Sequence, residues 1–161
     1  MSRSLGKVMP SNLLRLLDGT DLAERQGLTF LLLTTDDAGW PHLAMLSVGE
    51  LVAQNAQTLL AALWLHSSTT HNLDRHGRGV LAMVAEGAGY SVRCSAGRGP
   101  DLDLGEQGRL AAFVLTVEDV LEDAVSYASL TSGVTFRLNQ PDQVLPRWRR
   151  TIDALQHGYG S

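Results

Sequence analysis

Short apolar runs separated by turn-forming residues predict a domain that is mainly β, with a helix at each end. Gly, Pro and Asp residues separate many of the runs, which is typical of antiparallel strands joined by tight turns. The predicted strands are residues 28–35, 42–50, 57–65, 79–86, 90–98 and 109–122, with 133–138 as a candidate for the last strand. This order of elements favours an α+β domain built on an antiparallel barrel.

Three of these segments have patterns that indicate their place in the sheet. The turn sequence DDAGWP between residues 28–35 and 42–50 predicts a hairpin. Residues 57–65 are apolar nearly throughout, as expected for a strand that is covered on both faces. The segment 109–122 predicts either one long strand or a strand that bends near Glu118.

Helical periodicity marks the N-terminal segment and one connection between strands. Residues 11–26 place a row of leucines on one face, namely Leu13, Leu14 and Leu17. Either Ser11 or Asn12 is suited to cap this helix, and the turn-forming residues 18–21 are expected to break it into two short pieces. A further short helix is expected over residues 70–76.

The C-terminal segment predicts an amphipathic helix. Its apolar residues recur in steps of four, four and three, and they are Val144, Trp148, Ile152 and Leu155. We expect Asp142 to cap this helix. That cap places Pro146 in the first turn, where its missing N–H leaves no hydrogen bond unmade.

Composition narrows the class of protein. The 161 residues, 44% hydrophobic and 19% charged, suit one globular domain with a real core, and the net charge of −4 argues against a nucleic-acid binder. The single cysteine, Cys94, excludes an intrachain disulfide and is compatible with the cytoplasm. We read no signal peptide at the N-terminus, and no stretch has the roughly 18 apolar residues of a membrane-spanning helix.

Several clusters of chemically active residues favour structural interpretations. His66, His71 and His76 recur every five residues, which on a helix turns successive side chains about 140° apart, so we expect no metal site. The acidic cluster at 118–123 suits a solvated edge, and the PRWRR sequence at 146–150 suits an amphipathic helix. No complete dinucleotide-binding or P-loop motif is present.

Residues 67–72 hold more hydrogen-bonding groups than a helix cap needs. Four hydroxyl residues follow the third predicted strand, and Asn72 lies close behind them; they are Ser67, Ser68, Thr69 and Thr70. One such residue is enough to cap a helix. The surplus leaves two readings open, an oversupplied cap or a phosphate site at a helix N-terminus, with Arg75 and Arg78 following in the sequence.

The order of these motifs resembles the FMN-binding split-barrel family, which includes the pyridoxamine 5′-phosphate oxidases. The hairpin signature of that family, D-x-x-G-x-P-H/Y, is matched by Asp36, Gly39, Pro41 and His42. Its second element, G-S-R-K/T-x-x-N-L, is matched by Ser67, Asn72 and Leu73, and Arg78 and Leu81 follow. The resemblance covers residues 28–84 well and the last strand and helix more loosely.

The resemblance implies a six-stranded antiparallel split β-barrel with N-terminal and C-terminal helices, forming a homodimer with FMN at the subunit interface. It implies that residues after the hairpin proline line the flavin ring, namely Ala44, Met45, Leu46 and Ser47. It also assigns the ribityl and phosphate groups to the end of the third strand and the following turn, namely Leu63, Trp64, Leu65, Ser67, Ser68, Thr69, Thr70 and Asn72. The flavin would carry the chemistry, with no protein nucleophile.

The chain departs from the family at charged positions. Where the oxidases carry an Arg-Lys pair after the serine it has Ser68 and Thr69, and where they carry basic residues on the second strand it has Ala44 and Gly49. The implied phosphate site is therefore less positive. Candidates to restore the charge are Arg93, Arg98 and Arg137.

The leading hypothesis is an FMN-dependent oxidoreductase of unknown substrate in the cytoplasm. The full substrate site of the oxidases is not recognisable, so true pyridoxamine 5′-phosphate oxidase activity is not expected. The alternative is a non-enzymatic split-barrel module that binds a flavin, haem or another flat ligand, or a dimeric scaffold without cofactor. A deazaflavin in place of FMN also stays open.

Overall fold

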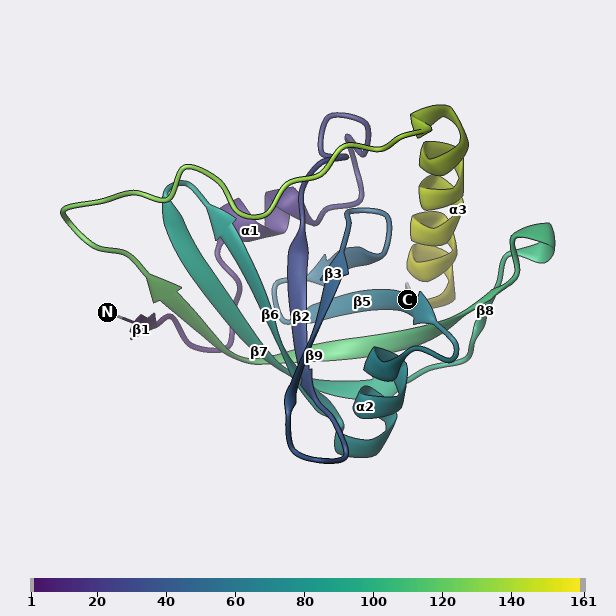
Figure 1. The fold of residues 1–161 in the computed structure, drawn as a ribbon, viewed down its shortest axis with the longest axis horizontal. Coiled ribbons are helices and arrows are strands. Elements are labelled where there is room, and N and C mark those ends of the chain that lie inside the picture. Colours follow the sequence, from purple (N-terminus) through teal and green to yellow (C-terminus); the bar gives the residue numbers. More distant parts are fainter. Residues whose placement is uncertain (1, 160–161) are drawn as a thin grey trace.

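The computed structural model describes residues 2–159 (Figure 1) and contains an antiparallel sheet with helices packed around it. The elements, in chain order, are β1 (Ser2–Ser4), α1 (Ser11–Leu16), β2 (Phe30–Thr35), β3 (Pro41–Leu46), β4 (Leu51–Asn55), β5 (Thr58–Trp64), α2 (Ser68–His76), β6 (Arg78–Ala85), β7 (Ala88–Arg98), β8 (Leu102–Asp103), the short 3₁₀ helix η1 (Gly105–Gln107), β9 (Arg109–Asp123) and α3 (Pro141–Tyr159).

The mainly β, antiparallel class is confirmed, but the six strands predicted for the split barrel are wrong in number, and the sheet is not closed. Within residues 2–159 the sheet has nine strands, seven of them in the order β3-β2-β6-β7-β9-β5-β4, and β3 and β4 do not pair to close it. The short strands β1 and β8 add to β9. They are too brief for a period-two pattern to reveal, and the predicted strand 42–50 ran into the turn before β4.

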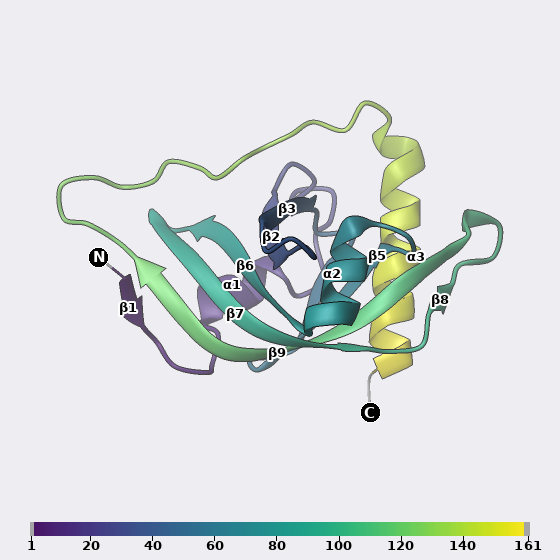
Figure 2. The same cartoon turned by 60° about the horizontal axis from the view of Figure 1, so that its bottom comes forward.

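The last predicted strand is not a strand. Of residues 133–138, only Thr135 makes a ladder contact, an isolated bridge to Leu28. Residues 124–140, called the strap below, instead run from β9 to α3 without a regular element (Figures 1 and 2). Most strap side chains are exposed, including Tyr127 at 88%. The residue types of this segment favour a strand, but no neighbouring strand pairs along it, so the predicted strand does not form.

Strand β9 organises the sheet. It pairs with β1, β5, β7 and β8, and Figure 2 shows it curving along the length of the molecule. Its register with β7 shifts between Arg93↔Asp119 and Cys94↔Val117, so Glu118 lies opposite no partner. The expected bend near Glu118 is therefore a β-bulge, which increases the local twist.

The core lies between the sheet and the helices. Strand β5 buries five successive residues, 59–63, which confirms that this strand is covered on both faces. Helix α3 buries three of the four predicted stripe residues, Trp148, Ile152 and Leu155, while Val144 is half-buried. No helix within residues 2–159 combines the length and the apolar character that crossing a membrane requires.

Two helix ends differ from prediction. Helix α1 ends at Leu16, and turns replace the rest of the predicted segment 11–26. Helix α3 begins at Pro141, whose fixed φ suits a first helical position, so Asp142 is not the cap and Pro146 lies inside the helix instead of in its first turn. At the start of α3, Gln140 accepts backbone hydrogen bonds through its carbonyl.

Candidate functional site

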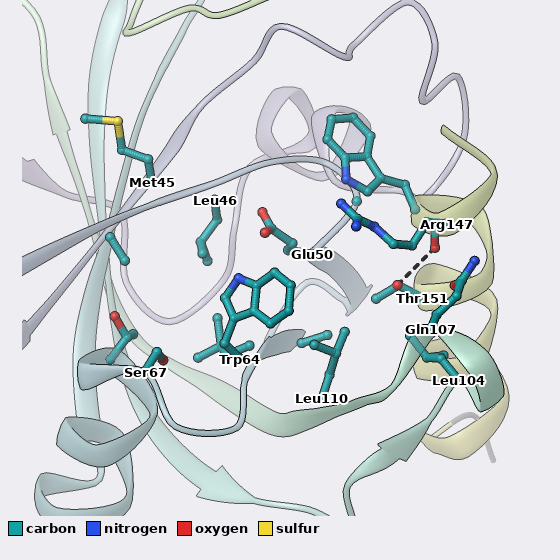
Figure 3. Close-up of a pocket in the computed structure, with 16 residues that line it drawn as sticks. Met45, Leu46, Glu50, Trp64, Ser67, Leu104, Gln107, Leu110, Arg147 and Thr151 are labelled. Carbon is teal, nitrogen blue, oxygen red and sulfur yellow. Dashed lines mark hydrogen bonds between the residues drawn. The ribbon is translucent and has the colours of Figure 1, made fainter. Parts of the chain in front are cut away.

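A groove of about 170 Å³ lies between the barrel strands and helix α3 (Figure 3). One wall comes from β3, β5 and the start of α2, and the other comes from η1, the start of β9 and α3. The groove therefore joins residues from the hairpin region to residues about a hundred positions later in the chain. It is the cavity that contains most of the residues implied by the sequence resemblance.

Seven of the twelve residues predicted to contact a cofactor line this groove. They are Ala44, Met45, Leu46, Leu63, Trp64, Ser67 and Thr69. The other five do not line it, and they are Ser47, Leu65, Ser68, Thr70 and Asn72. The split follows from helix geometry at α2 and from side-chain alternation along the strands.

Hydrogen bonds within the protein account for part of the surplus of hydroxyl groups at α2. The Ser67 Oγ caps the helix by accepting from the Thr70 backbone N–H at 3.1 Å. The Thr70 hydroxyl donates to the Trp64 carbonyl at 2.7 Å, and the buried Asn72 amide donates to the Thr34 hydroxyl at 3.0 Å. Thr70 and Asn72 therefore hold α2 against the sheet, whereas Ser67 and Thr69 face the groove. We call these two residues the hydroxyl end.

Two of the arginines near α2, Arg75 and Arg98, are engaged elsewhere. Asp37, on the β2–β3 turn, contacts the His71 Nε2 at 2.9 Å and the Arg75 Nε at 3.1 Å, and the hydrogen bond to His71 holds the pKa of Asp37 below its usual range. Arg98 pairs with Asp74 at 2.7 Å and with Asp101 at 2.8 Å. Among the described lining residues of the groove, no lysine or arginine lies at the hydroxyl end.

The proposed replacements for the missing charge therefore lie outside the groove. Arg93 is 3.9 Å from Asp119 and lines a different cavity, Arg98 is held by its two carboxylates, and Arg137 lies on the exposed strap. The histidines also do not assemble a metal site. Within residues 2–159, no three His, Cys, Asp or Glu side chains come together in a way that suits a metal ion.

The opposite end of the groove was not predicted from the sequence. It contains Glu50 at the start of β4, Gln107 from η1 and Arg147 from α3, and we call these three residues the polar end. Figure 3 shows the Arg147 side chain extending from α3 toward the Glu50 carboxyl. No local motif links these residues, because only the docking of α3 against the barrel brings them together.

The polar end contains two groups with unusual environments. Glu50 Oε2 accepts from the Ser47 backbone N–H at 2.6 Å and from the Ser47 hydroxyl at 2.9 Å. Burial nevertheless raises the pKa of Glu50, with the nearby Arg147 acting in the opposite direction. The Gln107 Oε1 is buried and has no hydrogen-bond partner among the described residues.

Comparison with known proteins shows the family to which this chain belongs. No protein-family model matches the chain. The uncharacterized protein YclD of Bacillus subtilis is 38% identical over 148 residues, which covers 92% of this chain and 96% of YclD. The chain belongs to the YclD family. No function comes with that relationship, since YclD is itself uncharacterized.

Solved structures show which fold this member of the YclD family has. A candidate pyridoxamine 5′-phosphate oxidase from Lactobacillus delbrueckii matches with a TM-score of 0.55 at 15% identity, over 73% of this chain and 98% of its own. A HupZ variant of Group A Streptococcus matches with a TM-score of 0.52 at 16% identity, over 71% and 98%. A Clostridium acetobutylicum protein of the pyridoxinephosphate oxidase family matches with 0.50 at 13%, over 77% and 99%. The resemblance to the split-barrel family is confirmed as a likeness of fold.

Helix α3 of this YclD-family chain packs directly onto Gly49. An added Cβ at Gly49 would lie 1.9 Å from the Trp148 Cγ. The indole of Trp148 therefore occupies the space that any side chain at position 49 would need. This packing couples the small residue at position 49 to the position of α3.

The outward face of strands β2, β3 and β6 is apolar. Cross-strand partners such as Leu33↔Leu43 and Leu31↔Met45 share this face, and its members are Leu31, Leu33, Leu43, Met45, Val80, Ala82 and Val84. Leu43 and Met45 are 46% and 62% exposed. The other five members are half-buried, and an apolar surface with exposed residues of this size is typical of an interaction site. Met45 belongs both to this apolar face and to the groove.

Proposed function

We propose that this protein binds FMN in the groove and acts as an FMN-dependent oxidoreductase. The observation that carries the proposal is the hydroxyl end. There Ser67 and Thr69 face a groove with apolar walls, at the start of a helix whose first N–H groups have no intrahelical partners. The walls next to it, Ala44, Leu63 and Trp64, suit a flat aromatic ring.

The groove of one chain is smaller than a complete cofactor site. Its volume of about 170 Å³ is below the roughly 300–1,000 Å³ of typical ligand pockets. The apolar face adjoins the groove at Met45. Both features support a homodimer in which a second copy covers the apolar face and completes the walls of the groove.

The residues present fit a flavin phosphate through neutral donors. Hydroxyls and helix N–H groups bind phosphate, but bonds assisted by a positive charge are stronger, so we expect a modest affinity. FMN, when bound, would supply two-electron chemistry. The chain would hold the phosphate at Thr69, cover the ring with Leu63 and Trp64, and shield it from water. A deazaflavin shares the ring shape and fits the same walls.

The absorbance spectrum of freshly purified protein tests the proposal. We expect a flavin spectrum, release of FMN on denaturation, and bleaching when a nicotinamide donor is added. Colourless protein that takes up no added FMN would contradict flavin binding. Bound FMN that no donor reduces would instead favour a non-enzymatic flavin-binding module.

A pair of variants tests the hydroxyl end. Thr69→Val keeps the shape of a buried residue and removes its hydroxyl, so FMN affinity should fall about fivefold to tenfold, as for one lost hydrogen bond. Ser68→Ala removes an exposed hydroxyl outside the groove and serves as the control. Equal affinities in the two variants would place the phosphate elsewhere.

A further inference from the structure

The polar end of the groove has features that flavin binding does not explain. Glu50, Gln107 and Arg147 lie away from the hydroxyl end, and each comes from a different element. We propose that the polar end binds the carboxylate of a small, planar organic acid, with Arg147 as its charged partner. The idea that this acid is the substrate of a redox reaction rests on the proposed function. The idea that it binds in the groove does not.

Arg147 is an arginine without an acidic partner. Arg147 lines the groove, and no carboxylate among residues 2–159 lies within ion-pair distance of its guanidinium, so its N–H groups are open to a ligand there. Its backbone is fixed in α3, where the Arg147 carbonyl accepts from the Thr151 hydroxyl at 3.0 Å (Figure 3). A planar guanidinium offers two parallel N–H groups that match a carboxylate.

Glu50 leaves room for a ligand group beside Arg147. It faces Arg147 across the groove, yet the two side chains form no ion pair, so the space between them can hold a ligand group. Arg147 is the other charged side chain among the described residues that line the groove. Burial disfavours the charged form of Glu50 and raises its pKa, which lessens the repulsion that this carboxyl would exert on a bound carboxylate.

Gln107 and the surrounding walls define the rest of the ligand. The buried Gln107 Oε1 requires a donor, which a ligand N–H, a ligand O–H or an ordered water would supply. The nearby walls are apolar. They consist of the flat indoles of Trp64 and Trp148 and the side chains of Leu104 and Leu110. These walls suit a planar, apolar body more than a sugar or a flexible polar chain.

The FMN phosphate is the other anion that could bind Arg147. A phosphate and a carboxylate both present oxyanions to a guanidinium, so an experiment must show which of them Arg147 binds. The hydroxyl end offers a phosphate the hydroxyls of Ser67 and Thr69 and the first N–H groups of α2, and no acidic side chain among the described residues lines that end. We therefore assign the phosphate to the hydroxyl end and the carboxylate to Arg147.

Calorimetric titration of the full-length protein with benzoate tests the assignment, with benzamide as the neutral probe of the same shape. Wild type should bind benzoate and show at least a tenfold preference over benzamide. Arg147→Gln should lose that preference, and Arg147→Lys should retain part of it. Arg150→Gln alters a neighbouring exposed arginine of α3 outside the groove, and it should bind benzoate like wild type.

Three results would overturn the proposal. These are the absence of benzoate binding to wild type, an unchanged preference in Arg147→Gln, or an equal loss in Arg150→Gln. A parallel titration with FMN and riboflavin identifies the phosphate site. If Arg147→Gln lowers the affinity for FMN tenfold and leaves the affinity for riboflavin unchanged, Arg147 binds the cofactor phosphate. The carboxylate assignment is then wrong. Because benzoate binding is measured without flavin, failure of FMN binding leaves this test readable.

Discussion

At the scale of single residues, Glu50 shows how a tight turn places an acid in a groove. The turn from Ser47 to Glu50 folds the carboxyl back onto the backbone N–H and hydroxyl of Ser47. Two hydrogen bonds stabilise the charged form, but burial raises the pKa of Glu50 beyond their effect. The folded chain therefore keeps the Glu50 proton at pH values where the unfolded chain has lost it.

This raised pKa predicts the sign of a pH effect on stability. Because the folded state binds the extra proton above the ordinary value of 4.5, the free energy of unfolding falls as the pH rises through the raised pKa. Glu50→Gln keeps the acceptor for Ser47 and removes the titration. We expect its stability in urea to fall less than that of wild type as the pH rises above the ordinary value of 4.5. The exposed Glu24→Gln should follow wild type, and identical profiles for all three proteins would refute the prediction.

At the scale of elements, helix α3 is held by close contact with the barrel. The Trp148 indole lies against the backbone of Gly49 and contacts Phe136 edge to face, with ring centroids 6.5 Å apart. Since Trp148 and Arg147 are neighbours on α3, the contact that docks the helix also sets where the guanidinium enters the groove. A change in docking should therefore alter ligand binding as well as stability.

Gly49→Ala tests this docking. The added methyl would lie far inside contact distance of the indole, so α3 must shift, and we expect a loss of about 1–3 kcal/mol in the free energy of unfolding. Gly97→Ala is the matched control because nothing lies within 4 Å of its added Cβ. Chemical denaturation of both variants measures the difference. A Gly49→Ala protein as stable as Gly97→Ala would mean that α3 docks loosely.

Helix α2 provides a second test, which separates structural residues from binding residues. The resemblance assigned Asn72 to the cofactor, but its buried amide bonds to Thr34 on β2. Asn72→Ala should therefore lower the free energy of unfolding by about 1–3 kcal/mol, because the Thr34 hydroxyl loses its buried partner. The folded variant should bind FMN with wild-type affinity. A selective loss of FMN affinity at unchanged stability would restore Asn72 to the cofactor site.

For the whole molecule, the sequence predicted the elements whose apolar residues recur with a regular period. It did not predict the features that arise when distant segments pack together. Strand β5 and the stripe of α3 were predictable because their apolar patterns are long and regular. Strands β1 and β8 were not, since three and two residues carry no readable period. Ser67 and Thr69 belong to a local motif, whereas Arg147 reaches the same groove only because α3 folds back onto the barrel.

The apolar face is also a property of the whole molecule, and it predicts the oligomeric state. If a second copy covers this face, Leu43→Asp should yield monomers, because a charge within it would be desolvated without a partner. Val8→Asp alters another exposed apolar residue outside the face and serves as the control. Light scattering after size-exclusion chromatography measures both masses. A wild-type monomer would contradict the dimer.

The strap has a consequence for how the chain responds to a protease. Arg137 lies exposed on this irregular segment, whereas most other arginines lie on or beside regular elements that must open locally before cleavage. Trypsin should therefore cut at Arg137 before it cuts at arginines within helices and strands, and separate α3 from the barrel sequence. Because Trp148, Ile152 and Leu155 remain buried in the core, the two fragments should run apart on a denaturing gel and together in native chromatography. The C-terminal segment would then behave as a peptide that complements a barrel lacking its last helix.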